Sequence, residues 1–438
     1  MAVKALKFGG SSLASAAQFQ KVAEIIKADD SRRYVVASAP GKRFADDIKV
    51  TDMLYECFKA ARKKQDIEPI FAKIEQRYNE IITELGLDFS LDEEFAKIKF
   101  AISHYVGEDY TASRGEYLNS MILAKYLGYD FIDAETGIFF KDNGTFDADH
   151  TNDVLSEILK EHERAVIPGF YGTMPNGTIK TFSRGGSDIT GSIVARAVDA
   201  EVYENWTDVS GMLMADPRIV KDPKVIQVIT YAELRELSYM GATVLHDEAI
   251  FPVREARIPI NIRNTNAPED DGTMIVPFAD KPNENIITGV AGRVGFSIIN
   301  IDKSMMNSEV GFGKKILKVI ENHDICFEHL PSGIDTMSVV VSTADIEGIR
   351  EDVVNEMFRK TKADFINIED GLALIAVVGR SMVQQVGTAG RVFTALGNAG
   401  INIKMIDQGS SELSIIIGVK EEEYAKTLEA IYSEFVKD

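Results

Sequence analysis

The chain opens with a pattern that could bind phosphate. Lys7 lies two residues before the pair Gly9 and Gly10, the hydroxyls of Ser11 and Ser12 follow, and a helical pattern begins directly afterwards. Glycines permit a tight turn with exposed N–H groups, a helix start adds the positive end of its dipole, and the lysine adds a full charge. A Walker A loop places its lysine after the glycines, and no such match occurs in the chain. These residue types fit a plain strand–turn–helix connection equally well.

A second glycine-rich turn strengthens the phosphate interpretation. Arg184 precedes Gly185 and Gly186, and Asp188 stands at the start of a helix predicted over 189–197. An arginine fork suits a carboxylate or a phosphate. Asp188 could orient a lysine or help to hold a metal, although aspartate is also a good helix N-cap. Two such loops together favour a two-sided site for a polyanion.

Two polar pairs follow a strand predicted over 202–206. Thr207 and Asp208 come directly after it, at the end of a strand where open α/β sheets bind ligands. Asp216 and Arg218 lie a few residues later, and Arg218 could meet a phosphate. An Asp-Pro turn with a solvated arginine explains that second pair equally simply.

Two further residues stand at predicted helix starts. Glu116 opens an apolar helical pattern, where a carboxylate either complements the helix dipole or accepts a substrate ammonium. Thr51 follows the polar loop 41–50, and its simplest interpretation is a helix N-cap.

Alternating strands and helices must position these residues. An α/β sheet with helices on both faces is predicted from strand-like runs at 34–39, 164–167, 179–182, 202–206 and 258–263. Residues 60–106 differ, because apolar residues recur there at helical spacing between charges. This segment predicts a helical insertion whose apolar stripe packs into the core: Ile70, Phe71, Ile74, Tyr78, Ile81, Ile82 and Leu85.

The last third of the chain is an internal repeat. A boundary is predicted at 264–285, which is rich in Pro, Asn, Asp and Gly. Beyond it, residues recur at an offset of 76, as in Val310-Gly311 against Val386-Gly387. Each unit is predicted as a ferredoxin-like β-α-β-β-α-β module, here duplicated. A duplicated scaffold without a ligand is the plainer alternative.

Composition excludes several classes of protein. The 438 residues carry a net charge of −20, which argues against nucleic acid as a partner. No apolar run approaches the ~20 residues of a membrane span, so no membrane association is expected. Cys57 and Cys326 form no pairing pattern, which indicates a reducing, cytoplasmic setting. The six histidines show no metal spacing, and no protein metal site is predicted.

Taken in order, the motifs resemble those of the aspartate kinases (aspartokinases) of the amino-acid kinase superfamily. The matching segments are Lys7–Ser12, Arg184–Asp188, Thr207–Asp208, Ala215–Arg218 and Leu237–Ala242. The duplicated module is similar to the paired C-terminal ACT domains of the monofunctional members. The resemblance implies a three-layer α/β/α kinase domain at 1–280, with the insertion at about 60–110. It also implies one ACT domain at 303–369 and another formed by 286–302 plus 370–438.

The resemblance implies the reaction of ATP, with Mg²⁺, and L-aspartate to give 4-phospho-L-aspartate, the first step towards lysine, threonine and methionine. The nucleophile is a carboxylate that is already ionised near pH 7, so no general base is needed. Catalysis must then come from positioning and charge neutralisation. The implied catalytic residues are Lys7, Gly10, Ser11 and Asp188. The implied substrate-binding residues are Ser38, Thr51, Glu116, Arg184 and Ser187. The implied nucleotide-binding residues are Lys7, Gly9, Gly10, Ser11, Gly186, Thr207, Asp208, Asp216 and Arg218.

Two positions depart from the family pattern. Leu213 stands where a tyrosine is common, and Thr243 stands where many relatives have a lysine. Both departures bear on how the nucleotide is held.

The ACT pair implies feedback control by lysine or threonine, and assembly as a homodimer or a dimer of dimers. The carboxylates among the implied effector residues favour lysine. Those residues are Met306, Ser308, Glu309, Gly311, Glu328, Ser332 and Asp335.

Two other functions fit parts of the sequence. A kinase of the superfamily that acts on glutamate, acetylglutamate or a nucleotide would share the loops, but not Glu116, the insertion and the ACT pair. A non-catalytic amino-acid sensor would not need Lys7, Arg184 and Asp188 intact.

Overall fold

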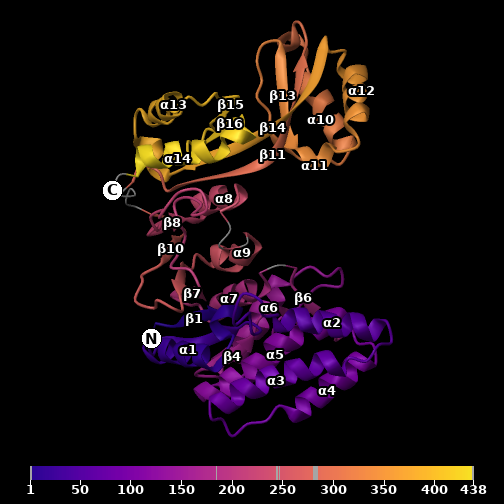
Figure 1. Ribbon diagram of the computed structural model, residues 1–438, viewed down its shortest axis with the longest axis vertical. Coiled ribbons are helices and arrows are strands. Elements are labelled where there is room, and N and C mark those ends of the chain that lie inside the picture. The colour runs from indigo at the N-terminus through magenta and orange to yellow at the C-terminus, as the bar shows by residue number, and fades with distance from the viewer. Residues whose placement is uncertain (1, 184, 243–244, 246, 280–284, 437–438) are drawn as a thin grey trace. The chain divides into compact units, whose positions relative to one another are not determined.

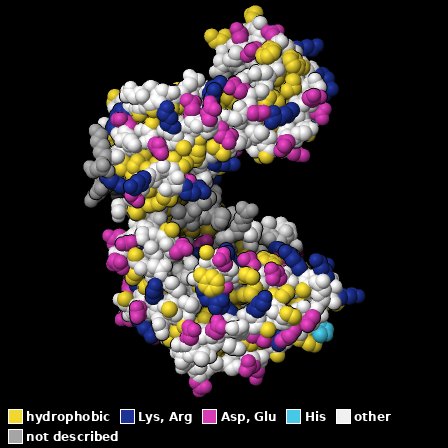
Figure 2. All heavy atoms as spheres, viewed as in Figure 1, with side chains coloured by type: hydrophobic (Ala, Val, Ile, Leu, Met, Phe, Trp, Pro, Cys, Tyr) yellow, Lys and Arg dark blue, Asp and Glu magenta, His cyan; other side chains and the backbone are white. Residues whose placement is uncertain are grey.

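The computed structural model describes all residues except 1, 184, 243–244, 246, 280–284 and 437–438. The described chain divides into two compact units (Figure 1). The first unit contains 1–212, 225–231 and 244–279, and the second contains 213–224, 232–243 and 280–438. Each unit is described below by itself. On the face seen in Figure 2, acidic and basic side chains are interspersed over the surface of both units.

An eight-stranded sheet is the framework of the first unit, in the order β3-β4-β2-β1-β7-β9-β10-β8. Neighbouring strands run parallel except β9 and β10. The strands are β1 (Lys4–Phe8), β2 (Arg32–Ala37), β3 (Asp130–Phe131), β4 (Ala165–Pro168), β7 (Val202–Thr207), β8 (Val228–Thr230), β9 (Ile260–Asn264) and β10 (Thr273–Val276). A separate two-stranded ribbon joins β5 (Tyr171–Thr173) to β6 (Ile179–Thr181). The predicted α/β sheet is confirmed.

Helices pack on this sheet, and some of them form a helical bundle beside it. They are α1 (Ala16–Lys27), α2 (Val50–Arg62), α3 (Glu68–Glu84), α4 (Asp92–Ser103), α5 (Glu108–Leu127), α6 (Ala148–Lys160), α7 (Gly186–Ala197) and α9 (Asp247–Ala256), with the short turns η1 (Gly10–Leu13) and η2 (Ala134–Thr136). The predicted insertion forms α3 and α4. Its apolar stripe is buried, since Phe71, Ile74 and Tyr78 expose no surface and share one core with Leu6 and Phe8 of β1.

Strand β1 lies where the order of the strands along the sheet reverses. Its neighbour on one side is β2 and on the other is β7. The register aligns Phe8 with both Ala37 and Trp206. The carboxyl ends of these strands therefore open at one edge of the sheet, at a topological switch point where α/β proteins bind ligands.

The second unit is built on a six-stranded antiparallel sheet, in the order β12-β13-β11-β14-β16-β15. The strands are β11 (Gly289–Asp302), β12 (Phe327–His329), β13 (Thr336–Ser342), β14 (Phe365–Val378), β15 (Met405–Asp407) and β16 (Ser414–Lys420). The helices are α8 (Tyr231–Tyr239), α10 (Phe312–Asn322), α11 (Thr343–Ile346), α12 (Arg350–Thr361), α13 (Thr388–Asn398) and α14 (Tyr424–Phe435), with the turns η3 (Met306–Ser308), η4 (Arg380–Gln384) and η5 (Glu421–Glu423).

The duplication is visible in the strand order and in matched helices. The long strands β11 and β14 each serve both halves, because residues 296–302 pair with β13 while residues 372–378 pair with β16. Helices α10 and α13 have equal length at an offset of 76 residues, and each begins after a glycine of positive φ, Gly311 (82°) or Gly387 (90°). A ferredoxin-like pair is confirmed, whereas the residue limits of the two ACT domains stay a prediction.

Within the described residues, no helix combines the length and the apolar character needed to cross a membrane.

Candidate active site

Lys7 lies at the switch point in a buried ion pair. Its Nζ is 2.7 Å from Oδ1 of Asp188, and both side chains are largely shielded from solvent. Asn205 lies opposite Lys7 on β7, and its Nδ2 donates to the same Oδ1 at 2.7 Å. The same oxygen of Asp188 therefore forms an ion pair with Lys7 of β1 and accepts a hydrogen bond from Asn205 of β7. These two contacts fix the ammonium group of Lys7 at the open edge of the sheet.

The glycine turn after β1 is held by backbone contacts. The amide of Gly9 donates to the carbonyl of Trp206 at 3.0 Å, so this amide is not available for a phosphate, contrary to the expectation for Gly9. Gly10 approaches the loop after β2 so closely that a Cβ would lie 2.8 Å from the Ala39 carbonyl oxygen. Within the described part of the chain, the amides of Gly10 and Ser11 meet no acceptor, which leaves these two as the predicted phosphate donors.

The second glycine turn begins α7. Gly185 is the N-cap, with a left-handed φ of 59°, so Asp188 lies inside the first turn and the N-cap interpretation of Asp188 is wrong. A Cβ on Gly186 would lie 2.5 Å from the Phe170 ring, and a Cβ on Gly169 would lie 2.6 Å from the Ser187 hydroxyl. The turn is thus packed tightly against the loop that follows β4, at the same edge of the sheet.

Glu116 is a buried acid with a strongly raised pKa. It is 6% exposed, and its Oε2 has no hydrogen-bond partner in the described structure. Burial raises the pKa of Glu116 to about 8, although hydrogen bonds from the backbone amides of Ala39 and of Glu116 itself and the charge of Arg114 act in the opposite direction. A buried carboxylate oxygen without a partner is costly unless a ligand supplies one.

The sequence placed Glu116 and Thr51 at the wrong points of their helices. Glu116 lies inside α5, which begins at Glu108, so the helix-dipole interpretation is wrong. Thr51 lies in the first turn of α2 behind the N-cap Lys49, so it is not the cap. Ser38 is buried directly after β2, and its carbonyl accepts from Nδ2 of Asn119 at 2.7 Å.

The predicted nucleotide residues fall in both units. Thr207 ends β7, and its hydroxyl donates to Oδ1 of the exposed Asp208 at 3.2 Å. Asp216 and Arg218 lie in the second unit and pair with each other, with 2.6 Å between Oδ2 and a guanidinium nitrogen. Arg184 and Thr243 lie outside the described residues.

The predicted effector residues lie in the second unit, where η3 meets the loop before β13. Oδ1 of Asp335 accepts from the amide of Met305 at 2.7 Å, and Glu309 pairs with Lys315 at 2.5 Å. Met306 is buried and Gly311 caps α10, whereas Ser308 and Ser332 are exposed. Glu328 instead receives a hydrogen bond from the Tyr239 hydroxyl.

No group of three or more His, Cys, Asp or Glu side chains in the described residues is arranged to hold a metal ion. Mg²⁺ commonly binds through one or two carboxylates together with substrate phosphates. The carboxylates of Asp188 and Asp208 fit that mode, since Asp188 lies in the first turn of α7 and Asp208 directly follows β7 at the open edge of the sheet.

Two residues of this site were not predicted. Asn205 lies next to Lys7 and Asn119 lies next to Ser38, and both amide side chains are buried. Oδ1 of Asn119 has no partner in the described structure. A polar residue inside the predicted strand 202–206 was the available signal for Asn205. The edge as a whole offers a buried ammonium, free loop amides and a buried carboxylate, which suits a substrate with both anionic and cationic groups.

Comparison with known proteins agrees with this geometry. Residues 3–264 match the amino acid kinase family, and residues 375–435 match the ACT domain. Aspartokinase 3 of Bacillus subtilis (strain 168) is 41% identical over 451 residues, which cover 99% of this chain and 98% of that protein. The crystal structure of Clostridium acetobutylicum aspartate kinase is 49% identical, with a TM-score of 0.93, over 99% of this chain and 100% of that chain.

More distant structures share the fold. E. coli aspartokinase III in complex with aspartate and ADP is 22% identical, with a TM-score of 0.74 over 99% of both chains. The same enzyme in complex with lysine and aspartate is 23% identical, with a TM-score of 0.70 over 99% of this chain and 100% of that chain. The chain therefore belongs to the amino acid kinase family and, within it, to the aspartokinases, phosphotransferases that carry ACT domains.

Proposed function

We propose that the open edge of the first unit transfers the γ-phosphoryl group of ATP to the side-chain carboxylate of L-aspartate. The observation that carries this proposal is that this edge holds both a buried ammonium, Lys7, fixed by Asp188, and a buried carboxyl group, Glu116, whose Oε2 has no partner in the described structure. Lys7 neutralises charge on the transferring group, and Asp188 with Asn205 holds its ammonium in place. The amides of Gly10, Ser11 and Gly186 bind phosphate oxygens.

Aspartate is bound through both of its charged ends. Glu116 accepts the substrate ammonium, which supplies the partner that Oε2 lacks. Arg184 grips the α-carboxylate, and the hydroxyls of Ser38, Thr51 and Ser187 bind the remaining oxygens. Placing the two reactants together converts the reaction into an effectively unimolecular step, which is the main source of rate when no general base is needed.

Thr207 and Asp208, at the end of β7 in the first unit, bind the nucleotide, and Gly9 shapes the turn after β1. Asp216 and Arg218 of the second unit are proposed as further nucleotide-binding residues. Asp188 and Asp208 would hold Mg²⁺ at this edge, where it would offset the charge of the nucleotide phosphates. The complex of E. coli aspartokinase III with aspartate and ADP supports the choice of substrates.

The ACT pair provides feedback control, with lysine as the effector, of this first step towards lysine, threonine and methionine. The lysine complex of E. coli aspartokinase III supports this effector. Met306, Ser308, Glu309, Gly311, Glu328, Ser332 and Asp335 form the effector region, and the ACT domains join chains into a homodimer or a dimer of dimers. Any inhibitor must bind two states of the enzyme with different affinity.

One assay tests the reaction. The full chain is incubated with ATP, Mg²⁺ and a candidate acid, and hydroxylamine traps the acyl phosphate that forms. The proposal predicts a signal with aspartate and none with glutamate or acetylglutamate. A signal with glutamate alone would show that the substrate is glutamate and not aspartate. No signal with any acid would favour a non-catalytic amino-acid sensor.

A further inference from the structure

A buried arginine joins the helical insertion to the glycine turn after β1. Arg77 lies in α3 and is 3% exposed. One of its terminal nitrogens donates to the carbonyl of Ala14 at 3.1 Å and to the carbonyl of Gly41 at 2.7 Å. The other donates to Oδ2 of Asp47 at 2.6 Å. A single guanidinium thus connects three points on two loops.

Those two loops are the ones that carry the site. Ala14 directly follows η1, the turn formed by the glycine pair after β1. Gly41 belongs to the loop after β2, and its amide donates to the Gly10 carbonyl at 2.8 Å. The same loop supplies the Ala39 amide to the Glu116 carboxylate and leads into Thr51 at the start of α2.

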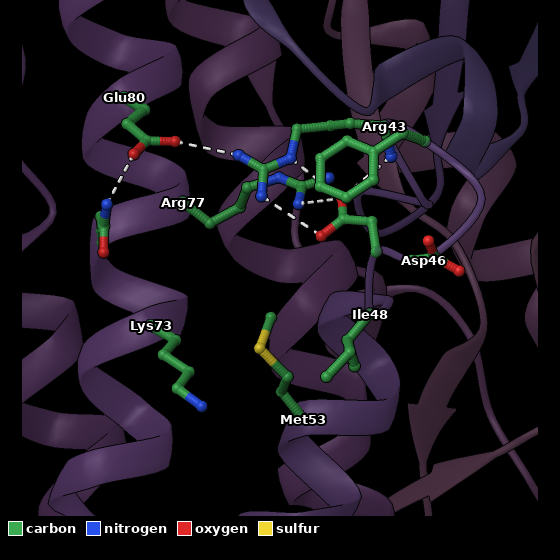
Figure 3. A pocket seen from close by; sticks show the side chains of 10 residues that line it. Arg43, Asp46, Ile48, Met53, Lys73, Arg77 and Glu80 are labelled. Atoms are coloured by element: carbon green, nitrogen blue, oxygen red, sulfur yellow. Dashed lines mark hydrogen bonds and ion pairs between the residues drawn. The ribbon is translucent and has the colours of Figure 1, made fainter.

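The far end of the loop is tied to the same arginine. Oδ2 of Asp47 accepts from the amide and from Nε of Arg43, both at 2.9 Å, and Arg43 reaches Glu80 of α3 at 3.0 Å. Figure 3 shows Arg77 and Glu80 on one helix facing Arg43 on the loop, beside a cavity of about 270 Å³. The bonds from Arg43, and then from Arg77, hold the pKa of Asp47 well below its usual range, so its charge persists at ordinary pH.

We infer that Arg77 is a positioning residue for the reaction: it sets the phosphate-binding turn after β1 and the aspartate-binding loop after β2 in register. The inference rests on the proposed function, because it assigns those loops to phosphate and aspartate. Only arginine has this geometry, since its planar fork reaches several acceptors at once whereas lysine offers a single point charge. The helical insertion thereby contributes to catalysis and not only to the core.

Kinetics of four variants of the full chain test this role. Arg77→Lys keeps the charge and loses the fork, Arg77→Ala removes both, and Asp47→Asn weakens the loop end of the network. Lys99→Met is the matched control, because Lys99 also ties two insertion helices together, through Glu75 at 3.0 Å, but does not contact either loop. Each variant is assayed by hydroxylamine trapping over a range of aspartate concentrations, with Tm measured alongside.

Arg77→Lys and Asp47→Asn are expected to raise the aspartate KM about tenfold and to lower kcat, because a loop displaced by about 1 Å no longer aligns the substrate. Loss of folded protein cannot change KM, so this readout separates positioning from stability. Free guanidinium at millimolar concentration is expected to restore part of the activity of Arg77→Ala. Lys99→Met should keep the wild-type constants.

Wild-type aspartate KM in both Arg77→Lys and Asp47→Asn would overturn the inference. If the wild type and Lys99→Met form no acyl phosphate from aspartate, the proposed function itself has failed, and the two failures are thereby distinguished.

Discussion

The charged groups at the open edge of the first unit are buried, whereas those of the predicted effector region are more exposed. Lys7 and Glu116 are 8% and 6% exposed, and one Glu116 oxygen has no partner in the described structure. Glu309, by contrast, is already paired with Lys303 at 3.4 Å and Lys315 at 2.5 Å, and Asp335 is exposed. Buried charge without a partner is costly, whereas exposed pairs contribute little. The active site is therefore prepared for a charged ligand, while an effector must compete with bonds that already exist.

Removal of the buried ammonium should have the largest effect. Lys7→Ala is expected to lower kcat about 1000-fold, with a much smaller change in the aspartate KM, because its charge matters most in the transition state. The measurement is the rate of acyl phosphate formation under saturating substrates. An unchanged kcat would remove Lys7 from the mechanism and erase the contrast between the two regions.

Glu116 should make stability depend on pH. Its pKa is about 8 in the folded chain, above the ordinary value of 4.5, so the folded state binds the extra proton between those values. The stability contributed by this proton is present below pH 4.5 and is lost as pH rises through 8, at up to about 1.4 kcal/mol per unit. Urea titrations from pH 5 to 8 should show this decline in the wild type and a shallower one in Glu116→Gln. Equal slopes would contradict the burial of the Glu116 carboxyl group.

Asn205 should have an intermediate effect. Asn205→Ala removes the hydrogen bond to Asp188 but keeps the ion pair with Lys7, so kcat should fall about tenfold. Asp188 would then hold the ammonium group of Lys7 without the support of Asn205. A fall as large as that of Lys7→Ala would instead assign Asn205 a direct contact with substrate.

The effector region should show the smallest effect. Glu309→Gln is expected to shift the midpoint of lysine inhibition by about twofold to fivefold, because its ion pairs are partly exposed and contribute little. Inhibition curves with lysine, and separately with threonine, measure this shift. Complete loss of inhibition would show that Glu309 receives the effector directly and would break the contrast.

Much of the fold could be predicted because its signals are local. The double glycine after an apolar strand and the 76-residue repeat depend only on residue type and spacing, and both correspond to observed elements. The apolar stripe of the insertion was equally clear, since Phe71, Ile74 and Tyr78 face one core.

The contacts that complete the site could not be predicted, because they join residues far apart in sequence. Asn205 on β7 reaches Asp188 in α7, and Arg77 reaches Ala14 across 63 positions. The start of α5 at Glu108 also escaped prediction, since the first turn lacks a strong cap. As a result, Glu116 was expected at a helix start, where its burial and its raised pKa would not arise.

The central claim is that the buried carboxylate of Glu116 binds the ammonium group of the substrate. The pH dependence of aspartate affinity tests this claim most directly. Calorimetric titration of the wild type should show binding that tightens as pH rises from 6 through 8, because the carboxyl must lose its proton to accept the ammonium. Glu116→Gln should bind aspartate weakly and without this dependence. Wild-type affinity in Glu116→Gln, or a flat profile in the wild type, would contradict the account.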